Sequence, residues 1–265
     1  MARFAPFTDT SPRGMAGTTG RLAKGAHVSI TTLEKVEPRL EFRNRLDEVR
    51  EASSSIGHSF SNEWAAGRLT KRQMGYWAMQ HWYYISRIPQ QFGIMYVRCP
   101  DADTRLYILE NLVGEEAESG RHPDLLLDFA EACGYDREEV QRADQDGRVL
   151  PTTRAIRAWI EELVQSRHIV EQAAGIMVAL EGQLPVMYTR YIEVCRQMGF
   201  TDESLQFFTV HIEGDTEHAG VGYELCERYA TTPHLEELAV GACRASAQMR
   251  VAYLDGVTRA IMEMA

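Results

Sequence analysis

The chain has 265 residues, of which 45% are hydrophobic, 25% charged and 9% aromatic. This length and composition suit one folded domain with a sizeable core and exclude an intrinsically disordered chain. The net charge of −10 argues against a broad nucleic-acid surface, because binding a phosphate backbone requires a basic face. We therefore expect small molecules as partners, and no nucleic acid.

The first 33 residues differ from the rest of the chain. They contain four basic residues against one acid, with several Gly, Ser, Thr and Pro residues, and they lack an amphipathic pattern. We predict a flexible N-terminal tail over residues 1–33 and a single helical-bundle domain over residues 34–265. An acid-poor, Arg-containing start is also compatible with an organelle-targeting segment.

No segment approaches the roughly 20 consecutive apolar residues that a membrane-spanning helix needs, and the start of the sequence has no apolar signal core. The cysteines are odd in number and form no CxxC pair, so they do not suggest a disulfide framework. They are Cys99, Cys133, Cys195, Cys226 and Cys243. These features predict a cytoplasmic protein whose cysteines are buried thiols in a reducing compartment.

From Leu33 onward, apolar residues recur at intervals of three and four, which is typical of helices, and the alternating runs of strands are missing. The predicted helices cover about residues 36–52, 58–67, 70 onward with a kink at Pro89, 101–120, 123–134, 153–165, 169–182, 185–198, 202–229 and 235–264. The expected fold is an all-α bundle of roughly eight to ten helices.

The helix predicted to kink at Pro89 is rich in aromatic residues. We interpret Trp77, Trp82, Tyr83 and Tyr84 mainly as core, since a bundle helix must bury such side chains. His81, on the same helix, is either a hydrogen-bonded core histidine or a residue that lines a pocket.

The strongest sign of chemistry is the trio of His211, Asp215 and His218. At positions i, i+4 and i+7 of an α-helix these side chains fall within roughly 60° of one another, while Glu213 and Glu217 point elsewhere. Two imidazoles and a carboxylate on one face suit Fe(II), Mn(II) or Zn(II). A solvated polar face is the alternative interpretation, and further ligands would be needed to complete a metal site.

Further ligands are available on either side of a predicted helix break at Gly120. Glu115 and His122 are seven residues apart and can approach one point from the end of one helix and the start of the next. Glu116 and Glu118 offer the same chemistry as Glu115.

Glu181 closes an apolar helical run over residues 176–180. A carboxylate in such a position is costly to bury unless a cation or a metal ion pairs with it. The alternative is a surface acid at a helix end, beside Gly182.

In chain order these residues resemble the ligand signature of the haem-oxygenase-like diiron oxidases, which share a helical fold with pyrroloquinoline-quinone synthase and thiaminase II. The signature here consists of Glu115, His122, Glu181, His211, Asp215 and His218. The resemblance covers roughly residues 36–260, and it is supported by the runs at 64–69, 111–116 and 122–125.

The resemblance implies two iron ions held by these six residues, with Glu115, Glu181 or Asp215 bridging them, and dioxygen as co-substrate. Manganese is an alternative metal. Four positive charges from two Fe(II) ions would offset three carboxylates, so the acids become tolerable in an interior when metal is bound. Related enzymes desaturate, cleave or N-oxygenate amino acids and similar compounds, so the resemblance implies an amino-acid-like substrate; a homodimer is also compatible with it. We predict that Glu115, and not Glu116 or Glu118, is the inward acid.

Two other classes of function stay open. One is a metal-free enzyme of the same fold, either a cofactorless oxidase or a thiaminase-like hydrolase, and the other is a non-catalytic helical interaction protein. Arg154, Arg157 and Arg190 are candidate partners of a substrate carboxylate, although surface charge is the simpler interpretation of each.

Overall fold

The computed structural model describes residues 36–118 and 120–264; within these ranges the side chains of residues 118 and 213–219 are left out of the description. The tail predicted over residues 1–33 therefore lies outside the described residues. In the part that is described, all regular structure is helical, which confirms the predicted all-α class.

Twelve α-helices make up most of the described chain. They are α1 (Leu40–Glu51), α2 (Ser59–Ala65), α3 (Lys71–Ile85), α4 (Ile88–Arg98), α5 (Ala102–Val113), α6 (His122–Ala132), α7 (Arg137–Gln141), α8 (Pro151–Ser166), α9 (Ile169–Gln172), α10 (Leu184–Gln197), α11 (Gln206–Tyr229) and α12 (Pro233–Met262). Four tighter or wider helical segments lie between them: the π-helices η1 (Gly114–Glu118) and η2 (Ala173–Leu180), and the 3-10 turns η3 (Glu181–Gln183) and η4 (Glu203–Leu205).

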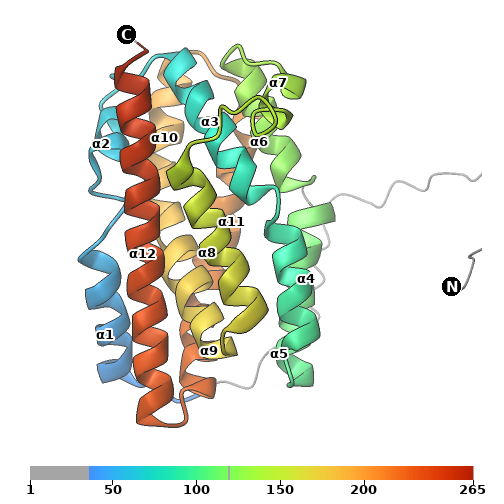
Figure 1. Cartoon of the computed structure of the whole chain (residues 1–265), viewed down its shortest axis with the longest axis vertical. Coiled ribbons are helices and arrows are strands. Elements are labelled where there is room, and N and C mark those ends of the chain that lie inside the picture. Colours follow the sequence, from blue (N-terminus) through green and yellow to red (C-terminus); the bar gives the residue numbers. More distant parts are fainter. Residues whose placement is uncertain (1–35, 119, 265) are drawn as a thin grey trace, which may run out of the picture.

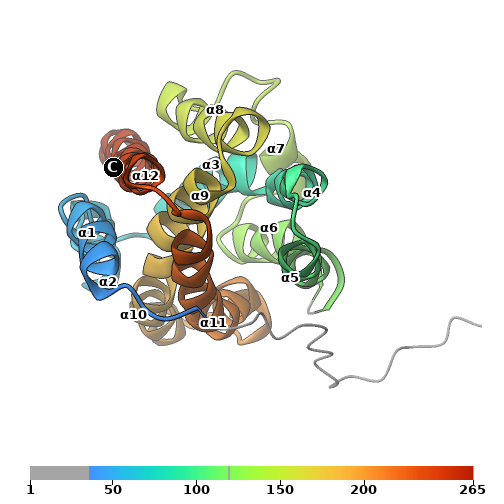
Figure 2. The same cartoon turned by 90° about the horizontal axis from the view of Figure 1, so that it is seen from below.

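The long helix α12 runs along most of the bundle, and α1 lies beside its lower half (Figure 1). Viewed from below, α4 and α5 pack side by side at the opposite edge (Figure 2). Helix α11 packs against α10, α6 and η2, while η2 also packs against α12. The π-helix η2 therefore lies between α11 and α12, whereas η1 packs against α5 and α4.

The described residues form more helical segments than the eight to ten predicted, and Pro89 explains one of the differences. Pro89 does not kink a continuous helix: α3 ends at Ile85 and Pro89 lies in the first turn of α4. Proline is favoured there because its missing N–H would have no partner within the helix. Helix α7 was not predicted, because its five residues, capped by Asp136, are too few to show a periodic pattern.

The core contains a group of packed aromatic rings. Trp64 stacks on Tyr191 with 4.3 Å between the ring centroids, and Trp77 stacks on Phe208 at 5.9 Å. Trp77 and Tyr84 are each 2% exposed, as expected for core residues, whereas Trp82 and Tyr83 are half-buried. All five cysteines are buried and free, as predicted.

No helix among the described residues has the length and apolar character needed to cross a bilayer.

Candidate metal centre

Glu115 lies in η1, which continues α5 with wider turns. It follows the buried Asn111 by four residues, so it continues the inward face of α5. Its side chain is 16% exposed, and its Oε2 lies 3.2 Å from Nδ1 of His122. The neighbouring Glu116 instead forms a more exposed ion pair with Arg121, at 2.7 Å. Of these two adjacent acids, Glu115 is the one beside His122.

His122 is the first residue of α6, directly before Pro123. The proline keeps the start of the helix at this point, so the imidazole projects from the first turn. The His122 side chain is 12% exposed. Its ring lies 4.7 Å from the ring of His211, centroid to centroid.

His211 lies in the first half of α11 and is half-buried. Its Nδ1 donates a hydrogen bond of 2.6 Å to the backbone oxygen of Phe207, one turn earlier. Because a carbonyl oxygen only accepts, Nδ1 must carry the proton, and Nε2 has its lone pair directed outward. A second hydrogen bond of this kind fixes the ring of most metal-binding histidines.

The structure thus brings together Glu115, His122 and His211, whose ligand atoms all lie within 4.8 Å of one another. They come from three separate helical segments, η1, α6 and α11. One carboxylate oxygen and two imidazole nitrogens suit a first-row divalent ion such as Fe(II) or Mn(II). The residues present therefore fit an iron site.

Of the other three candidate ligands, the structure describes only the side chain of Glu181. Glu181 is half-buried at the first residue of η3, which packs against α11, but it is not part of the 4.8 Å cluster. Asp215 and His218 follow His211 on the helical backbone of α11, and their side chains fall outside the description. The same is true of Glu213 and Glu217.

A buried network lies beside the cluster and includes His81. The Nε2 atom of His81 lies 3.3 Å from the Tyr188 hydroxyl, and its Nδ1 lies 3.3 Å from the Tyr253 hydroxyl. Burial, with Arg250 and His211 nearby, lowers the pKa of His81 well below its ordinary value. His81 is a hydrogen-bonded interior histidine, and neutral at pH 7.

The arginines considered as substrate partners make structural contacts instead. Arg157 pairs with Glu161 at 2.9 Å, and Arg154 pairs with Asp144. Arg190 donates to the Ile56 carbonyl oxygen at 3.0 Å.

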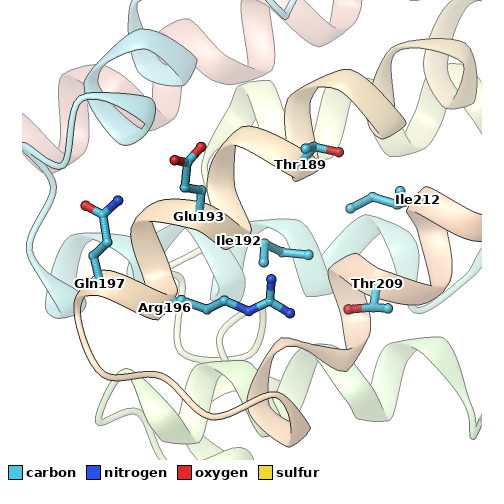
Figure 3. Close-up of a pocket in the computed structure, with 7 residues that line it drawn as sticks. All are labelled: Thr189, Ile192, Glu193, Arg196, Gln197, Thr209 and Ile212. Carbon is cyan, nitrogen blue, oxygen red and sulfur yellow. The ribbon is translucent and has the colours of Figure 1, made fainter.

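A groove on the surface between α10 and α11 lies outside this centre (Figure 3). Ile192 and Thr209 line it, and Arg196 crosses it, but Arg196 is already paired with Asp202 at 2.9 Å. The groove contains none of the six candidate ligands.

The bundle and its histidine and carboxylate cluster define a protein with a candidate non-haem metal centre. The family model described as iron-containing redox enzyme matches residues 75–251, two thirds of the chain and the part that contains all six candidate ligands. The chain belongs to this family.

Two similar proteins extend the comparison over most of the chain. The 4-aminobenzoate synthase of Nitrosomonas europaea is 26% identical over 227 residues, which are 82% of this chain and 90% of that protein. The pyrroloquinoline-quinone synthase of Acidiphilium cryptum is 25% identical over 225 residues, 81% of this chain and 89% of that protein.

A solved structure confirms the fold. A domain of unknown function with a haem-oxygenase-like fold, from Shewanella denitrificans, matches with a TM-score of 0.69 and 16% identity, over 85% of this chain and 94% of that one. The predicted haem-oxygenase-like bundle is therefore correct.

Proposed function

We propose that this chain is a non-haem diiron oxidase that uses dioxygen to oxidise a small, amino-acid-like substrate. The observation that carries the proposal is the cluster of Glu115, His122 and His211, contributed by three segments that are distant in sequence. Membership of an iron-containing redox enzyme family supports iron over other divalent ions.

Six ligands would hold the two ions. They are Glu115, His122, Glu181, His211, Asp215 and His218. Three carboxylates against four positive charges leave a small net charge, which an interior tolerates better than three free acids. Mn(II) has similar ligand preferences and is the expected substitute.

Bound iron would supply the electrons with which dioxygen is reduced. The protein's own part is to hold and shield this chemistry. The Phe207 carbonyl fixes the ring of His211, and the rings of Phe207 and Tyr188 lie 4.5 Å and 6.0 Å from the His211 ring. These aromatic walls limit the access of water to the inner side of the centre.

The names of the similar proteins support the proposed substrate class. Their names specify synthases of 4-aminobenzoate and pyrroloquinoline quinone, both small nitrogen-containing compounds. A small substrate with a nitrogen function agrees with desaturation, cleavage or N-oxygenation of an amino-acid-like compound.

The metal-free alternatives differ in how the chemistry starts. A thiaminase-like enzyme would need a reactive thiolate, but burial raises the pKa of Cys195 and Cys243 to about 12 and also raises the pKa of Cys133 and Cys226. This disfavours a cysteine nucleophile. A cofactorless oxidase remains the competitor that experiment must separate from the diiron enzyme.

The test is anaerobic reconstitution with Fe(II), followed by measurement of bound iron and of dioxygen uptake with amino acids and aromatic amines. We expect about two iron ions per chain if both proposed sites fill, and uptake that depends on one class of substrate. Full turnover in the presence of a strong Fe(II) chelator would contradict the proposal and favour the cofactorless oxidase.

A matched pair of variants on α11 sharpens this test. His218→Ala removes an imidazole that water replaces poorly, so iron content and dioxygen uptake should both be lost. Glu217→Ala changes the adjacent residue, which helical phase places on another face, and should keep both. If the two variants behave alike, the assignment of this face of α11 to the metal is wrong.

A further inference from the structure

A buried cation on α12 has no counter-charge among the described residues. Arg250 is 4% exposed, and the hydrogen-bonding atoms Nε and Nη1 of its guanidinium have no partner. No carboxylate in the described part of the chain lies within ion-pairing distance of Arg250, whereas most other arginines there are paired. The Tyr84 hydroxyl lies near the guanidinium and interacts with it.

The surroundings of Arg250 make this arrangement costly. Tyr84, Tyr191 and Tyr253 are each within electrostatic range of the guanidinium, and all are at most 2% exposed. These phenols are neutral, because burial raises the pKa of each. A buried guanidinium among neutral groups lacks the compensation that buried charges normally have.

The same network reaches the candidate metal centre. His81 connects to Tyr253 and Tyr188 through contacts of 3.3 Å at its two ring nitrogens. The Tyr188 ring is 6.0 Å from the ring of His211. Arg250 therefore lies in a buried polar network, and Tyr188 at the other end of this network packs against His211 of the metal cluster.

We infer that Arg250 is the residue that binds the carboxylate of the substrate. A guanidinium binds a carboxylate through charge-assisted N–H donors, and Nε and Nη1 of Arg250 both have such donors without a partner. The buried phenols and His81 surround this position with aromatic surface. The ligand class is therefore a small carboxylic acid with an aromatic or apolar body. This inference rests on the proposed function, since the buried polar network joins the surroundings of Arg250 to the Tyr188 ring that packs on His211.

The experiment compares carboxylates with their uncharged amides. Fe(II)-loaded full-length protein is titrated calorimetrically under anaerobic conditions with 4-aminobenzoate, benzoate and phenylacetate, and with the three corresponding amides. We expect the wild-type protein to bind at least one carboxylate about 10-fold or more tightly than its amide, the range of a charge-assisted hydrogen bond. Arg250→Gln should abolish this preference. The control Arg244→Gln, an exposed arginine on the same helix, should keep it.

A carboxylate that bound the metal directly would keep its preference in Arg250→Gln, and this result would overturn the inference. Wild-type protein that prefers none of the three carboxylates would overturn it as well. The melting temperature of ligand-free protein provides a second readout. Because the cation is uncompensated, Arg250→Met should leave the melting temperature unchanged or raise it. Unfolding of both Arg250→Gln and Arg250→Met would assign a structural role and contradict the inference.

Iron content, measured on the same samples, separates the two proposals. Arg250→Gln should retain iron at the wild-type level. If the wild-type protein bound no iron but showed a carboxylate preference that depends on Arg250, the diiron proposal would fail and the carboxylate site would stand. Iron binding and dioxygen uptake without that preference would give the reverse result.

Discussion

Two buried charges on neighbouring helices differ in whether the described chain supplies a counter-charge. Glu227 of α11 is 5% exposed and accepts hydrogen bonds from Nε and Nη2 of Arg43 at 2.7 Å each and from the backbone N–H of Arg39 at 2.6 Å. Arg250 of α12 is 4% exposed and has no carboxylate partner in the described part of the chain. Glu227 therefore holds α1 against the bundle, whereas Arg250 forms no ion pair of this kind between helices.

The difference separates structural charges from binding charges. A buried charge whose counter-charge belongs to the chain is complete after folding, while a buried charge without one is completed only by a ligand. The cluster of Glu115, His122 and His211 lies between these cases. Its members contact one another, yet they have the composition of a metal-binding set.

The largest effect is expected from a variant that breaks the metal cluster. Glu115→Gln removes the charge and a lone-pair site next to His122 and His211, so Fe(II) affinity should fall by at least about 10-fold, the lower range for losing even an indirect contact of a metal site. Glu116→Gln alters only an exposed ion pair with Arg121 and should bind iron as the wild type does. Anaerobic titration with Fe(II) measures both. Equal affinities would mean that Glu115 is not a ligand.

A smaller effect, on stability, is expected from breaking the buried ion pair of Glu227 with Arg43. Glu227→Gln leaves Arg43 without its carboxylate, and breaking a buried pair costs about 3 kcal/mol, reduced here to about 2 kcal/mol because Arg43 is 27% exposed. Unfolding in urea measures the loss. Arg250→Met, by contrast, should cost nothing in ligand-free protein. Should both variants lose the same stability, Arg250 and Glu227 would have the same structural role.

The pH dependence of stability provides the control for Glu227. Burial alone raises the pKa of this carboxyl, but the hydrogen bonds from Arg43 and Arg39 outweigh burial and leave the pKa lowered. A lowered pKa in the folded state contributes stability that is present above the unfolded value of about 4.3 and lost as the pH falls through the folded value. The wild type should therefore lose stability more steeply below about pH 4 than Glu227→Gln does.

Much of the fold could be predicted because it depends on local patterns. The spacing of apolar residues located most helices, and Thr70 with Gln73 forms a capping box where a helix start was expected. The end of α3 before Pro89 could not be separated from a kink, because proline permits both. The π-helices η1 and η2 also escaped prediction, since one widened turn leaves the apolar spacing almost unchanged.

The candidate site was predictable in part from chemistry and local geometry. Helical phase selected His211 together with Asp215 and His218, and Glu115 and His122 were candidates because they flank a predicted helix break. The structure brings Glu115, His122 and His211 together. Arg250 was missed because the tyrosines around it come from α3, α10 and α12, and contacts between separate helices are not visible in sequence. One signal was available: Arg250 follows the buried Cys243 by seven residues, which puts a cation on the buried face of its helix.

The smallest expected effect tests the contact that holds α11, with both His211 and Glu227, against η2. Gly222 of α11 approaches η2 so closely that an added Cβ would lie 2.8 Å from Cβ of Met177 and 3.2 Å from Cγ2 of Val178. Gly220, half a turn away, has no atom within 4 Å of such a Cβ. Gly222→Ala should therefore destabilise the protein by about 1 kcal/mol, because α11 must shift away from a packed neighbour. Gly220→Ala should stabilise it by about 0.5 kcal/mol through helix propensity alone.

Urea unfolding of the two variants measures these opposite signs, and iron affinity in Gly222→Ala reports whether the shift of α11 reaches His211. A stabilising Gly222→Ala would mean that α11 and η2 have room to spare, and the position of His211 would then not depend on this contact.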